Sequence, residues 1–559
     1  MRKIFFVIFA LAVIVSACAP APTATPVPPT AAPTQVAAPV PPPQPTKFVP
    51  PRGGEYRIAN TGDAPTLHPF KSTDTASNAY ISRMFTGAVW RYNPETLDPE
   101  PWMMSWKVSD DFKTVTFTLN DIKWSDGKPV TAFDFQWTFD QAMKKENNWP
   151  YRADPERNIV SYKALDAKTL QVSIKDGKPL PVLLNKVDVL NTPLPQHIWE
   201  KYDWNDPKTN PEILQPSVVN GQFLLKEWKR DDHATFTRND SYFKGSPNIE
   251  SITYRIVPNS QVSLQMLLNG EVDAGAVSNN DFEKAKASDK LNLYQWDPAA
   301  ASWSYIGFNL RRAPQNDVEF RHALAYAIPR DVLSKTVYNN LSKPTFSTFP
   351  PTSPFFNPNV PKYDFNMDTA KATLDKAGYK LDKDGNRLGK DGKPIKLKLM
   401  HNVPSPAREK VAVIAQEQFK QLGIQVEIIT LEFGAYLQAL KKEPYDWDLD
   451  LLGWSVPIEP SGVRDIWAEA TIPDLNSVAY VNKKQEDLWD QGEKEFDPAK
   501  RKLIYQEIQR ILAEDSPYIF TVYDTGWTFY NKRVTPNKAT RVGVAYEFFN
   551  WFITPGTTP

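Results

Sequence analysis

The cysteine content most limits how this chain can fold. Its 559 residues include one cysteine, Cys18, so no disulfide can form within the chain and no zinc site can be built from several thiolates. The body of the chain, residues 52–559, must therefore be stabilised by a large buried apolar core. A body of this length is typical of about two to four domains.

Cys18 follows a segment with the order of an export signal: two basic residues, an apolar run at 4–15, then small residues. The run of about a dozen residues is too short to span a bilayer, which needs roughly 20. Residues 15–18, Val-Ser-Ala-Cys, resemble the lipobox of bacterial lipoproteins, whose thiol accepts a diacylglycerol. We expect residues 1–17 to be a signal peptide and Cys18 to be the lipid attachment site. The alternative is an ordinary secretory signal in which the cysteine occurs by chance.

Residues 18–51 form a tract rich in Pro, Ala and Thr, without glycine and with one charged residue, Lys47. Such a composition cannot build a core and favours an extended, semi-rigid tether. We expect an exported protein held by lipid at the outer face of the cytoplasmic membrane. Whether that face meets a periplasm or the cell exterior stays open at this point.

The charge balance and the motif content argue against several classes of function. Lys plus Arg equal Asp plus Glu at 65 each, so we expect no nucleic-acid partner. The five histidines are scattered, and the sequence has no HExxH, GxSxG or P-loop motif. We therefore expect no metal, no cofactor and no catalytic residues. An exported hydrolase is the remote alternative, because two of the many acids could serve a glycosidase.

The apolar pattern along the chain mixes strands with helices. Residues 114–119 alternate apolar side chains with threonine, which predicts a half-buried strand, and residues 319–332 show helical spacing. Residues 395–431 read as strand, helix and strand, with Gly423 as the helix stop. A further helix is predicted over 499–514. Together these patterns predict an α/β fold.

Residues 109–139, "SDDFKTVTFTLNDIKWSDGKPVTAFDFQWTF", resemble the signature segment of the family 5 extracellular solute-binding proteins, the peptide, dipeptide and nickel receptors of ATP-driven importers. Asn120 departs from it, because a basic residue is usual there. Further matches follow in order along 52–559: "NTGDAPTLHPF", "GFNL", "EFRHALAYAIPRDVL", "YDFNMDTAKATLDKAGY", "YDWDLDLLGWSVPIEP" and "RKLIYQEIQRILAEDSPYIFTVY". His68 and Pro329 are further departures, where Asn and Asp are common.

This resemblance implies a two-lobed periplasmic-binding-protein fold of the class with an extra domain, its lobes joined by two hinge strands. The implied boundaries are 52–72, 188–275 and 524–559 for lobe I, 73–187 for the extra domain, and 276–523 for lobe II. The implied function is capture of a solute by hinge closure, with no covalent step.

The implied partners are a membrane permease and ATPase of the ABC importer class that recognise the closed form. A monomer is the family expectation. A sensory lipoprotein that hands its closed form to a signalling partner would share these sequence features, and an importer permease encoded beside the gene would favour import.

The ligand segment implied by the resemblance is Asp448–Trp467. In peptide-binding relatives a Gly-Trp pair opens a loop into the cleft, and an aspartate three residues after the Trp pairs with the peptide's α-amine; that position is Pro457 here. Glu459 could supply the charge instead, and Trp454 could form a stacking wall. Three further candidates for ligand contact are Trp467, Trp303 and Tyr305, and core packing is the competing interpretation for all of the aromatic residues.

The resemblance favours an oligopeptide as the ligand. An oligosaccharide is the alternative, because the expected amine anchor is missing and a cleft rich in tryptophan suits the faces of sugar rings. Nickel and haem are disfavoured, since no histidine or cysteine lies on the ligand segment.

The lipid anchor can be tested by metabolic labelling. Radioactive palmitate is expected to label the protein, and Cys18→Ala is expected to abolish the label because the acylated thiol is gone. Label that persists in the Cys18→Ala variant would contradict the anchor.

Overall fold

The computed structural model describes residues 48–72, 74–86, 89–188, 192–403 and 405–555. Residues 50–559 form one compact unit. Cys18, the signal peptide over 1–17 and most of the tether lie outside the described residues, so the predictions made for them stay predictions. Within the described ranges no helix combines the length and hydropathy that a membrane span requires.

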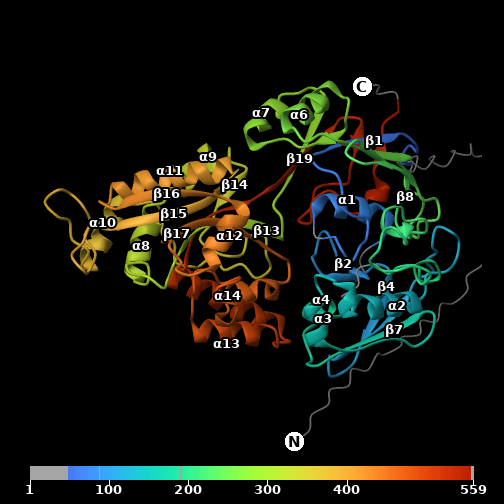
Figure 1. Ribbon diagram of the computed structural model, residues 1–559, viewed down its shortest axis with the longest axis horizontal. Helices are drawn as coiled ribbons and strands as arrows, with labels where there is room; N and C mark the ends of the chain where they lie inside the picture. The colour runs from blue at the N-terminus through green and yellow to red at the C-terminus, as the bar shows by residue number, and fades with distance from the viewer. Residues whose placement is uncertain (1–47, 73, 87–88, 189–191, 404, 556–559) are drawn as a thin grey trace, which may run out of the picture. The chain divides into compact units, whose positions relative to one another are not determined.

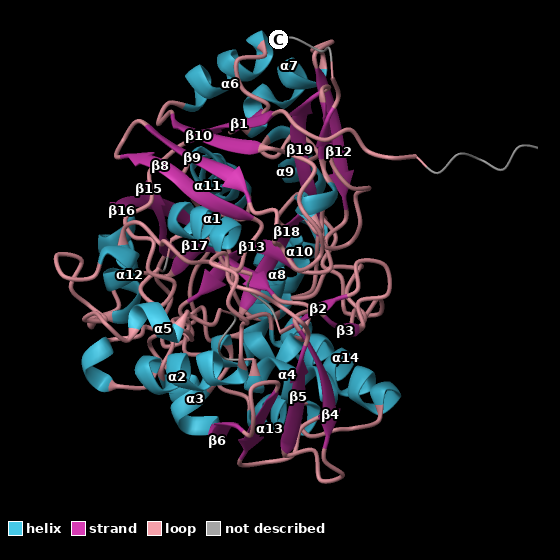
Figure 2. Ribbon diagram, turned by 90° about the vertical axis from the view of Figure 1, so that its right-hand side faces the viewer, coloured by secondary structure: helices cyan, strands magenta, loops and turns pink. Residues whose placement is uncertain are grey.

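The first lobe is built on a five-stranded sheet of order β11-β1-β10-β9-β8. Its strands are β1 (Glu55–Asn60), β8 (Phe223–Lys229), β9 (His233–Arg238), β10 (Ser251–Ile256) and β11 (Ala274–Gly275). β1 lies between β11 and β10 and is parallel to both, whereas β8, β9 and β10 pair antiparallel. Figure 2 shows β1, β8, β9 and β10 side by side.

Short helices and strand pairs complete the first lobe: α1 (Thr75–Met84), α6 (Ser260–Asn269), α7 (Phe282–Lys286), β12 (Leu291–Trp296), β19 (Gly526–Asn531), β20 (Val534–Thr535) and β21 (Phe552–Ile553). α5 (Gln196–Trp199) instead packs against the helix Ala132–Ala142 of the extra domain. β12 pairs antiparallel with β19, and β20 pairs with β21. Asn259 caps α6 by accepting from the backbone N–H groups of Gln261 and Val262.

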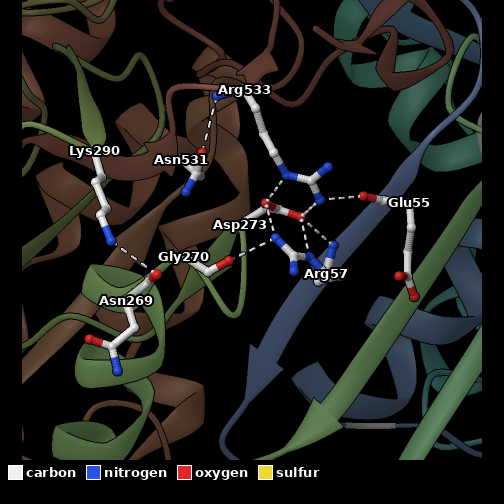
Figure 3. A network of polar contacts seen from close by, with 8 residues as sticks. All are labelled: Glu55, Arg57, Asn269, Gly270, Asp273, Lys290, Asn531 and Arg533. Carbon is white, nitrogen blue, oxygen red and sulfur yellow. Dashed lines mark hydrogen bonds and ion pairs between the residues drawn. The ribbon is translucent and has the colours of Figure 1, made fainter. Parts of the chain in front are cut away.

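One buried carboxylate joins three distant segments of the first lobe (Figure 3). Asp273 is fully buried. It accepts bonds from the Arg57 guanidinium at 3.1 and 3.3 Å and from the Arg533 guanidinium at 2.6 and 2.6 Å. Arg533 also donates to the backbone carbonyl of Glu55 at 2.7 Å. Because burying a carboxylate is costly unless it is paired and hydrogen-bonded, this double pairing fixes how the segments meet.

The extra domain is built on a four-stranded antiparallel sheet of order β4-β5-β7-β6. Its elements are β2 (Trp90–Tyr92), β3 (Pro99–Pro101), β4 (Met104–Val108), β5 (Thr114–Leu119), α2 (Ala132–Ala142), α3 (Ala153–Asn158), β6 (Ile159–Ala164), β7 (Thr169–Ile174) and α4 (Leu180–Val187). β5 is the strand predicted over 114–119, and its apolar residues are the buried ones. One apolar core runs continuously from this sheet into the five-stranded sheet.

The second lobe is built on a six-stranded sheet of order β14-β18-β13-β17-β15-β16. Its strands are β13 (Ala301–Phe308), β14 (Ser342–Pro344), β15 (Lys396–Val403), β16 (Gln425–Glu432), β17 (Leu449–Val456) and β18 (Tyr518–Asp524). The strand-helix-strand pattern predicted over 395–431 is confirmed, because β15 and β16 are parallel and α11 (Pro406–Lys420) connects them.

Helices cover both faces of this sheet (Figure 1). One face packs against α8 (Val318–Tyr326), α9 (Arg330–Thr336), α10 (Met367–Lys376) and α11 in an aliphatic core. The other face packs against α12 (Phe433–Lys441), α13 (Lys483–Gly492) and α14 (Pro498–Asp515) in a core rich in Trp and Tyr. The sheets and helices confirm the α/β prediction, including the helix expected over 499–514.

The helical spacing noted over 319–332 belongs to two helices and not to one. α8 ends at Tyr326 and α9 begins at Arg330, so the helical pattern is interrupted at Pro329. Proline lacks the backbone N–H that a helix interior needs, and its ring disfavours the helical conformation of the preceding residue. The apolar spacing continues across the break because both short helices pack on the same core.

Residues 276–296, assigned to lobe II from the sequence, pack with the first lobe instead. Phe282, Ala285 and Leu291 join Leu264 and Phe529 in one apolar cluster. The reason is the pairing of β12 with β19, which draws this segment onto the first lobe.

A two-stranded ribbon runs through both lobes. β12 pairs with β19 in the first lobe, and the strands that continue the same two chain segments, β13 and β18, pair antiparallel in the second. Between the two paired regions lie residues 297–302 on one segment and 524–525 on the other. The chain therefore passes between the lobes as a pair of adjacent segments.

The pairing at Asp273 predicts a large stability loss on its removal. Asp273→Asn is expected to destabilise the protein by about 3 kcal/mol, because two partly buried guanidinium groups lose their fully buried counter-charge. Differential scanning calorimetry measures the effect as a lowered Tm. Asp289→Asn, at an exposed aspartate, is the control and is expected to leave Tm unchanged; an equal Tm for both variants would contradict the role given to Asp273.

Candidate functional site

Three strands of the six-stranded sheet end at one edge. β15 is parallel to β16 and to β17, so the carboxyl ends of these strands, at Val403, Glu432 and Val456, lie on the same side. In open α/β sheets ligands bind outside the carboxyl ends of the strands. The ligand segment predicted from the sequence, Asp448–Trp467, leaves the sheet at this edge.

Trp454 lies near the carboxyl end of β17, directly opposite Trp303 in the antiparallel pair of β13 and β17. The two side chains therefore project from the same face of the sheet. The ring of Trp454 is half-buried and packs on the aromatic core of the second lobe. Among the five predicted ligand residues, it is the one whose side chain is partly exposed.

Trp303, Tyr305 and Trp467 lie inside that aromatic core, with 1%, 1% and 0% of their surfaces exposed. The rings of Trp303 and Trp467 are near-parallel, with centroids 6.2 Å apart. Tyr305 stacks on Tyr518 at 3.9 Å. The structure thus places these residues as a packed layer that supports Trp454, and direct contact with a ligand stays a prediction for all three.

Glu459 is buried and bound to Arg501. Its two carboxylate oxygens accept from the two terminal nitrogens of Arg501 at 3.0 and 2.5 Å. Glu459 also caps the short helical turn at 460–466 by accepting from the backbone N–H of Ser461. Both partners are almost fully buried. The carboxylate is therefore neutralised by the protein itself, and its pairing with a ligand amine stays a prediction.

The other face of the β13–β17 pair carries small polar side chains near the same edge. The Ser302 and Ser455 hydroxyls are 2.9 Å apart. Gly453 lies opposite Ser304, and a Cβ on Gly453 would lie 2.8 Å from the Trp303 carbonyl oxygen. The lack of bulk leaves room next to the strand ends.

A cavity of about 390 Å³ opens beside these strands and is lined by residues of both lobes. The second lobe contributes Ser304, Asn402 and Arg408, the first lobe contributes Asn279 and Trp527, and Asp524 lies where the chain passes between them. A volume of this size falls within the range of about 300–1,000 Å³ that is usual for ligand pockets. Its lining is mostly polar, which suits a hydrogen-bonding ligand.

One side of this cavity favours an anionic group. Ser405 and Ala407, at the N-terminus of α11, line the cavity, and the first backbone N–H groups of a helix are unpaired and carry partial positive charge. Arg408 adds a full positive charge and donates to the Asn402 side chain. A carboxylate is the common group that such a combination binds.

Asp524 gives the same cavity a negative charge. Its carboxylate accepts from the Ser342 hydroxyl at 2.9 Å, and no described cation forms an ion pair with it. Its side chain is exposed toward the cavity, and desolvation there raises the pKa of this carboxyl above its usual value. The cavity therefore presents groups of both signs, as a zwitterionic ligand requires.

Two contacts join the extra domain to the second lobe. The Lys178 ammonium lies 3.2 Å from the Glu493 carboxylate, and the rings of Phe112 and Phe496 have centroids 4.6 Å apart. The same region holds a second cavity of about 630 Å³, into which Tyr92, Phe355 and the Glu459–Arg501 pair project.

Three residues that line the cavity of about 390 Å³ were not predicted from the sequence: Asn402, Arg408 and Asp524. A usable signal existed for the first two: the predicted strand ends in "HN" and is followed by "SPAR", where Ser before Pro is typical of a helix start. Asp524 had no such signal, because its position depends on how distant strands pair. Across the part of the chain that the structure describes, no group of three or more His, Cys, Asp or Glu could hold a metal ion.

Comparison with known proteins gives consistent matches over most of the chain. The family model described as bacterial extracellular solute-binding proteins, family 5 middle, matches residues 98–471. The oligopeptide-binding protein AppA of Bacillus subtilis is 26% identical over 488 residues, which cover 85% of this chain and 87% of that protein. The oligopeptide-binding protein OppA of the same organism is 28% identical over 476 residues, covering 81% and 84%.

Solved structures match to the same extent. The structure of Bacillus subtilis AppA in complex with a nonapeptide has a TM-score of 0.72 at 25% identity and covers 90% of this chain and all of that one. CtaP, an ABC transporter substrate-binding protein of Listeria monocytogenes, has a TM-score of 0.77 at 23% identity with the same coverage, and shows a shared fold. These neighbours confirm the prediction of a two-lobed α/β fold.

The pairing of Glu459 with Arg501 predicts a structural role that stability measurements can separate from ligand contact. Glu459→Gln is expected to destabilise the protein by about 3–5 kcal/mol, because Arg501 is left buried without a counter-charge. A lowered Tm measures this loss, and Glu469→Gln, at an exposed glutamate nearby, is expected to leave Tm unchanged. If the Glu459→Gln variant kept its Tm and lost only ligand binding, Glu459 would be a ligand contact and not a structural residue.

Proposed function

The chain belongs to the bacterial extracellular solute-binding proteins of family 5, and we propose that it captures oligopeptides between its lobes and delivers them to a membrane importer. The observation that carries this proposal is the cavity lined by both lobes, with Arg408 and the α11 N-terminus on one side and Asp524 on another. A peptide carries a carboxylate, an ammonium and many backbone hydrogen-bonding groups, which suits this polar, two-signed lining.

The relatives support a peptide as the ligand class. AppA and OppA of Bacillus subtilis are oligopeptide-binding proteins, and DppE of the same organism is a dipeptide-binding protein. The AppA structure holds a nonapeptide. The match to AppA and OppA extends over four-fifths or more of each chain, so the peptide assignment draws on the whole receptor and not on one motif.

Within the site, Trp454 is the proposed stacking wall for the ligand. It lies at the carboxyl edge of the sheet, is half-buried, is the direct cross-strand partner of Trp303, and packs on the aromatic core that also contains Trp467. A ring supported in this way loses little freedom when a ligand packs on it. The aromatic core that holds this ring in place also contains Trp303, Tyr305 and Trp467. Glu459 fixes the loop that follows β17 through its bond to Arg501.

Capture would proceed by a hinge movement at the ribbon formed by β12–β13 and β18–β19. A ligand that contacts both lobes binds the closed arrangement more tightly than the open one, and so shifts the population toward closure. The lobe boundaries that suit this movement lie at 297–302 and 524–525. The closed form would then be recognised by an ABC permease with its ATPase, and the protein would act as a monomer held to the membrane through lipid on Cys18.

An oligosaccharide is the second candidate ligand, and Pro457 is the observation that favours it. Peptide receptors resembling this chain carry an aspartate at that position, and Glu459 is occupied by Arg501. The tryptophan at the sheet edge would then stack on a sugar ring.

Thermal unfolding of residues 52–559 against a ligand panel tests the proposal. The panel contains peptides of two to nine residues and cello-, xylo- and manno-oligosaccharides. A ligand at about 100 times its Kd stabilises the folded state by roughly 2.7 kcal/mol, which raises Tm measurably. Peptides are expected to raise Tm and sugars are not.

The Trp454→Ala variant completes the design. It is expected to weaken binding by about 1–3 kcal/mol, because a desolvated aromatic contact is lost, while its Tm without ligand changes little. A panel in which only sugars raise Tm would replace the peptide assignment with the oligosaccharide one. A large drop in the Tm of the Trp454→Ala variant without ligand would show that Trp454 stabilises the core and is not chiefly a ligand contact.

A further inference from the structure

The extra domain and the first lobe form one body, because they share a continuous apolar core. This body touches the second lobe through the pair of Lys178 with Glu493 and the rings of Phe112 and Phe496. Neither contact involves the ribbon between the lobes or the lining of the cavity that contains Arg408. The two bodies therefore meet at a place apart from both the hinge and the candidate site.

Two turns of the extra domain, residues 109–113 and 175–178, pack on each other and form one tip. The backbone N–H of Lys178 donates to the Phe112 carbonyl at 3.2 Å. A Cβ on Gly177 would lie 2.4 Å from a backbone carbonyl oxygen of the first turn, so this close approach requires glycine. The tip is thus tightly built, and it carries both residues that contact the second lobe.

Phe112 has an unusual backbone conformation, with φ at +54°. Residues other than glycine rarely adopt this left-handed region. The turn is held by the Asp111 carboxylate, which accepts from the Ser109 hydroxyl at 2.6 Å and from the Lys113 N–H at 3.1 Å. Backbone strain that the surrounding structure maintains is common at functional positions, and here it accompanies a ring that contacts the other body.

The tip meets the second lobe at the connector between α13 and α14, residues 493–497. Glu493 caps the C-terminus of α13, and α14 begins directly after the connector. The Arg501 guanidinium donates to the Gly492 carbonyl at 2.8 Å. Because Arg501 also pairs with Glu459, the connector is joined to the predicted ligand segment through one buried side chain.

The two contacts combine a charge pair with an aromatic pair. The Lys178 ammonium lies 3.2 Å from the Glu493 carboxylate, and only 13% and 16% of the two side chains are exposed. Salt screens such a shielded pair less than a fully exposed one. The rings of Phe112 and Phe496 are tilted by 58° with centroids 4.6 Å apart, which is a favourable aromatic arrangement. Both contacts form between protein groups alone.

We propose that the tip and the connector form a clasp that stabilises the closed arrangement of the lobes independently of the ligand. This inference rests on the proposed capture by hinge closure. A ligand that binds only the closed form has an apparent Kd equal to its intrinsic Kd divided by the fraction of closed protein. The clasp raises that fraction, so breaking it is expected to weaken the binding of every ligand by the same factor.

The apolar cavity of about 630 Å³ beside the clasp gives the competing interpretation. Phe112 and Phe496 line this cavity, whereas Lys178 and Glu493 are not among the described residues that line it. If a ligand side chain occupied the cavity, the two rings would contact the ligand. Loss of either ring would then weaken only ligands with large apolar side chains, so the two interpretations predict different results.

The test is isothermal titration calorimetry of residues 52–559 with two nonapeptides, one of alanine and serine only and one that contains phenylalanine and leucine. Lys178→Glu places two carboxylates against each other and is expected to weaken the binding of both peptides by about three- to tenfold. Glu493→Lys is expected to have the same effect. The doubly exchanged variant, Lys178→Glu with Glu493→Lys, is expected to restore most of the affinity, because the pair forms again with its charges reversed.

The aromatic half of the clasp has its own variant and control. Phe496→Ala is expected to weaken the binding of both peptides by the same factor. Equal loss is the result that a clasp requires; a loss confined to the peptide with phenylalanine and leucine would overturn the role of the rings in the clasp. Phe365→Ala, at an exposed phenylalanine of the second lobe, and Lys128→Glu, at an exposed lysine of the extra domain, are expected to leave both affinities unchanged.

A second measurement needs no ligand. Residues 52–559 contain no cysteine, so spin labels can be attached specifically at Lys163→Cys of the extra domain and Lys376→Cys of the second lobe, both exposed positions. Double electron–electron resonance without peptide measures the distances between the labels. Lys178→Glu is expected to shift these distances toward the open form, and the doubly exchanged variant is expected to return them.

The two measurements together separate the outcomes. Unchanged distances in Lys178→Glu would overturn the clasp, whatever the affinities, and would leave the peptide function standing. Shifted distances without any loss of affinity would also overturn it, because a contact that favours closure must contribute to binding. If wild type bound no peptide, the peptide function would fall, and the distances alone would decide whether the clasp exists.

Discussion

The first lobe depends on one buried carboxylate. Asp273 is bonded to Arg57, 216 residues earlier in the chain, and to Arg533, 260 residues later. The sheet that holds β1, β10 and β11 is therefore secured by a residue near the C-terminus. Because contacts over such sequence distances form late in folding, this lobe cannot reach its final arrangement until almost the whole chain is available. The second lobe has no such requirement for its β15-α11-β16 unit, whose pairing is local.

Locally periodic features could be predicted from the sequence, and features that depend on distant partners could not. The strand over 114–119 and the unit over 395–431 were predictable because burial alternates within the segment itself. The sequence contains Pro329, yet the break between α8 and α9 was not predicted from it. The apolar spacing continues on both sides of the proline because both helices pack on the same core. The placement of 276–296 on the first lobe depends on the pairing of β12 with β19, which no local pattern reveals.

The residues of the candidate site also differ in whether their roles could be predicted from local sequence or depend on distant partners. Aromatic residues on the predicted ligand segment suit a core and a cleft equally well, so Trp454 and Trp467 could not be told apart by sequence. The structure distinguishes them, because Trp454 is half-buried at the sheet edge and Trp467 is fully buried. The free charge predicted at Glu459 depended on the absence of a partner, and Arg501 lies 42 residues away. Asp524 became visible only through the cavity that it lines, because its position depends on how distant strands pair.

The paired segments that connect the lobes set the mechanics of the molecule. Two separate linkers would allow the lobes to twist and slide as well as bend, whereas strands that are hydrogen-bonded to each other on both sides of the gap resist shear and torsion. Residues 297–302 and 524–525 lie between the two paired regions and are free of that pairing, which favours bending of one lobe against the other over twisting. In the proposed capture, a receptor that bends in this one way would present a similar closed surface with different peptides, and one docking partner would serve many cargoes.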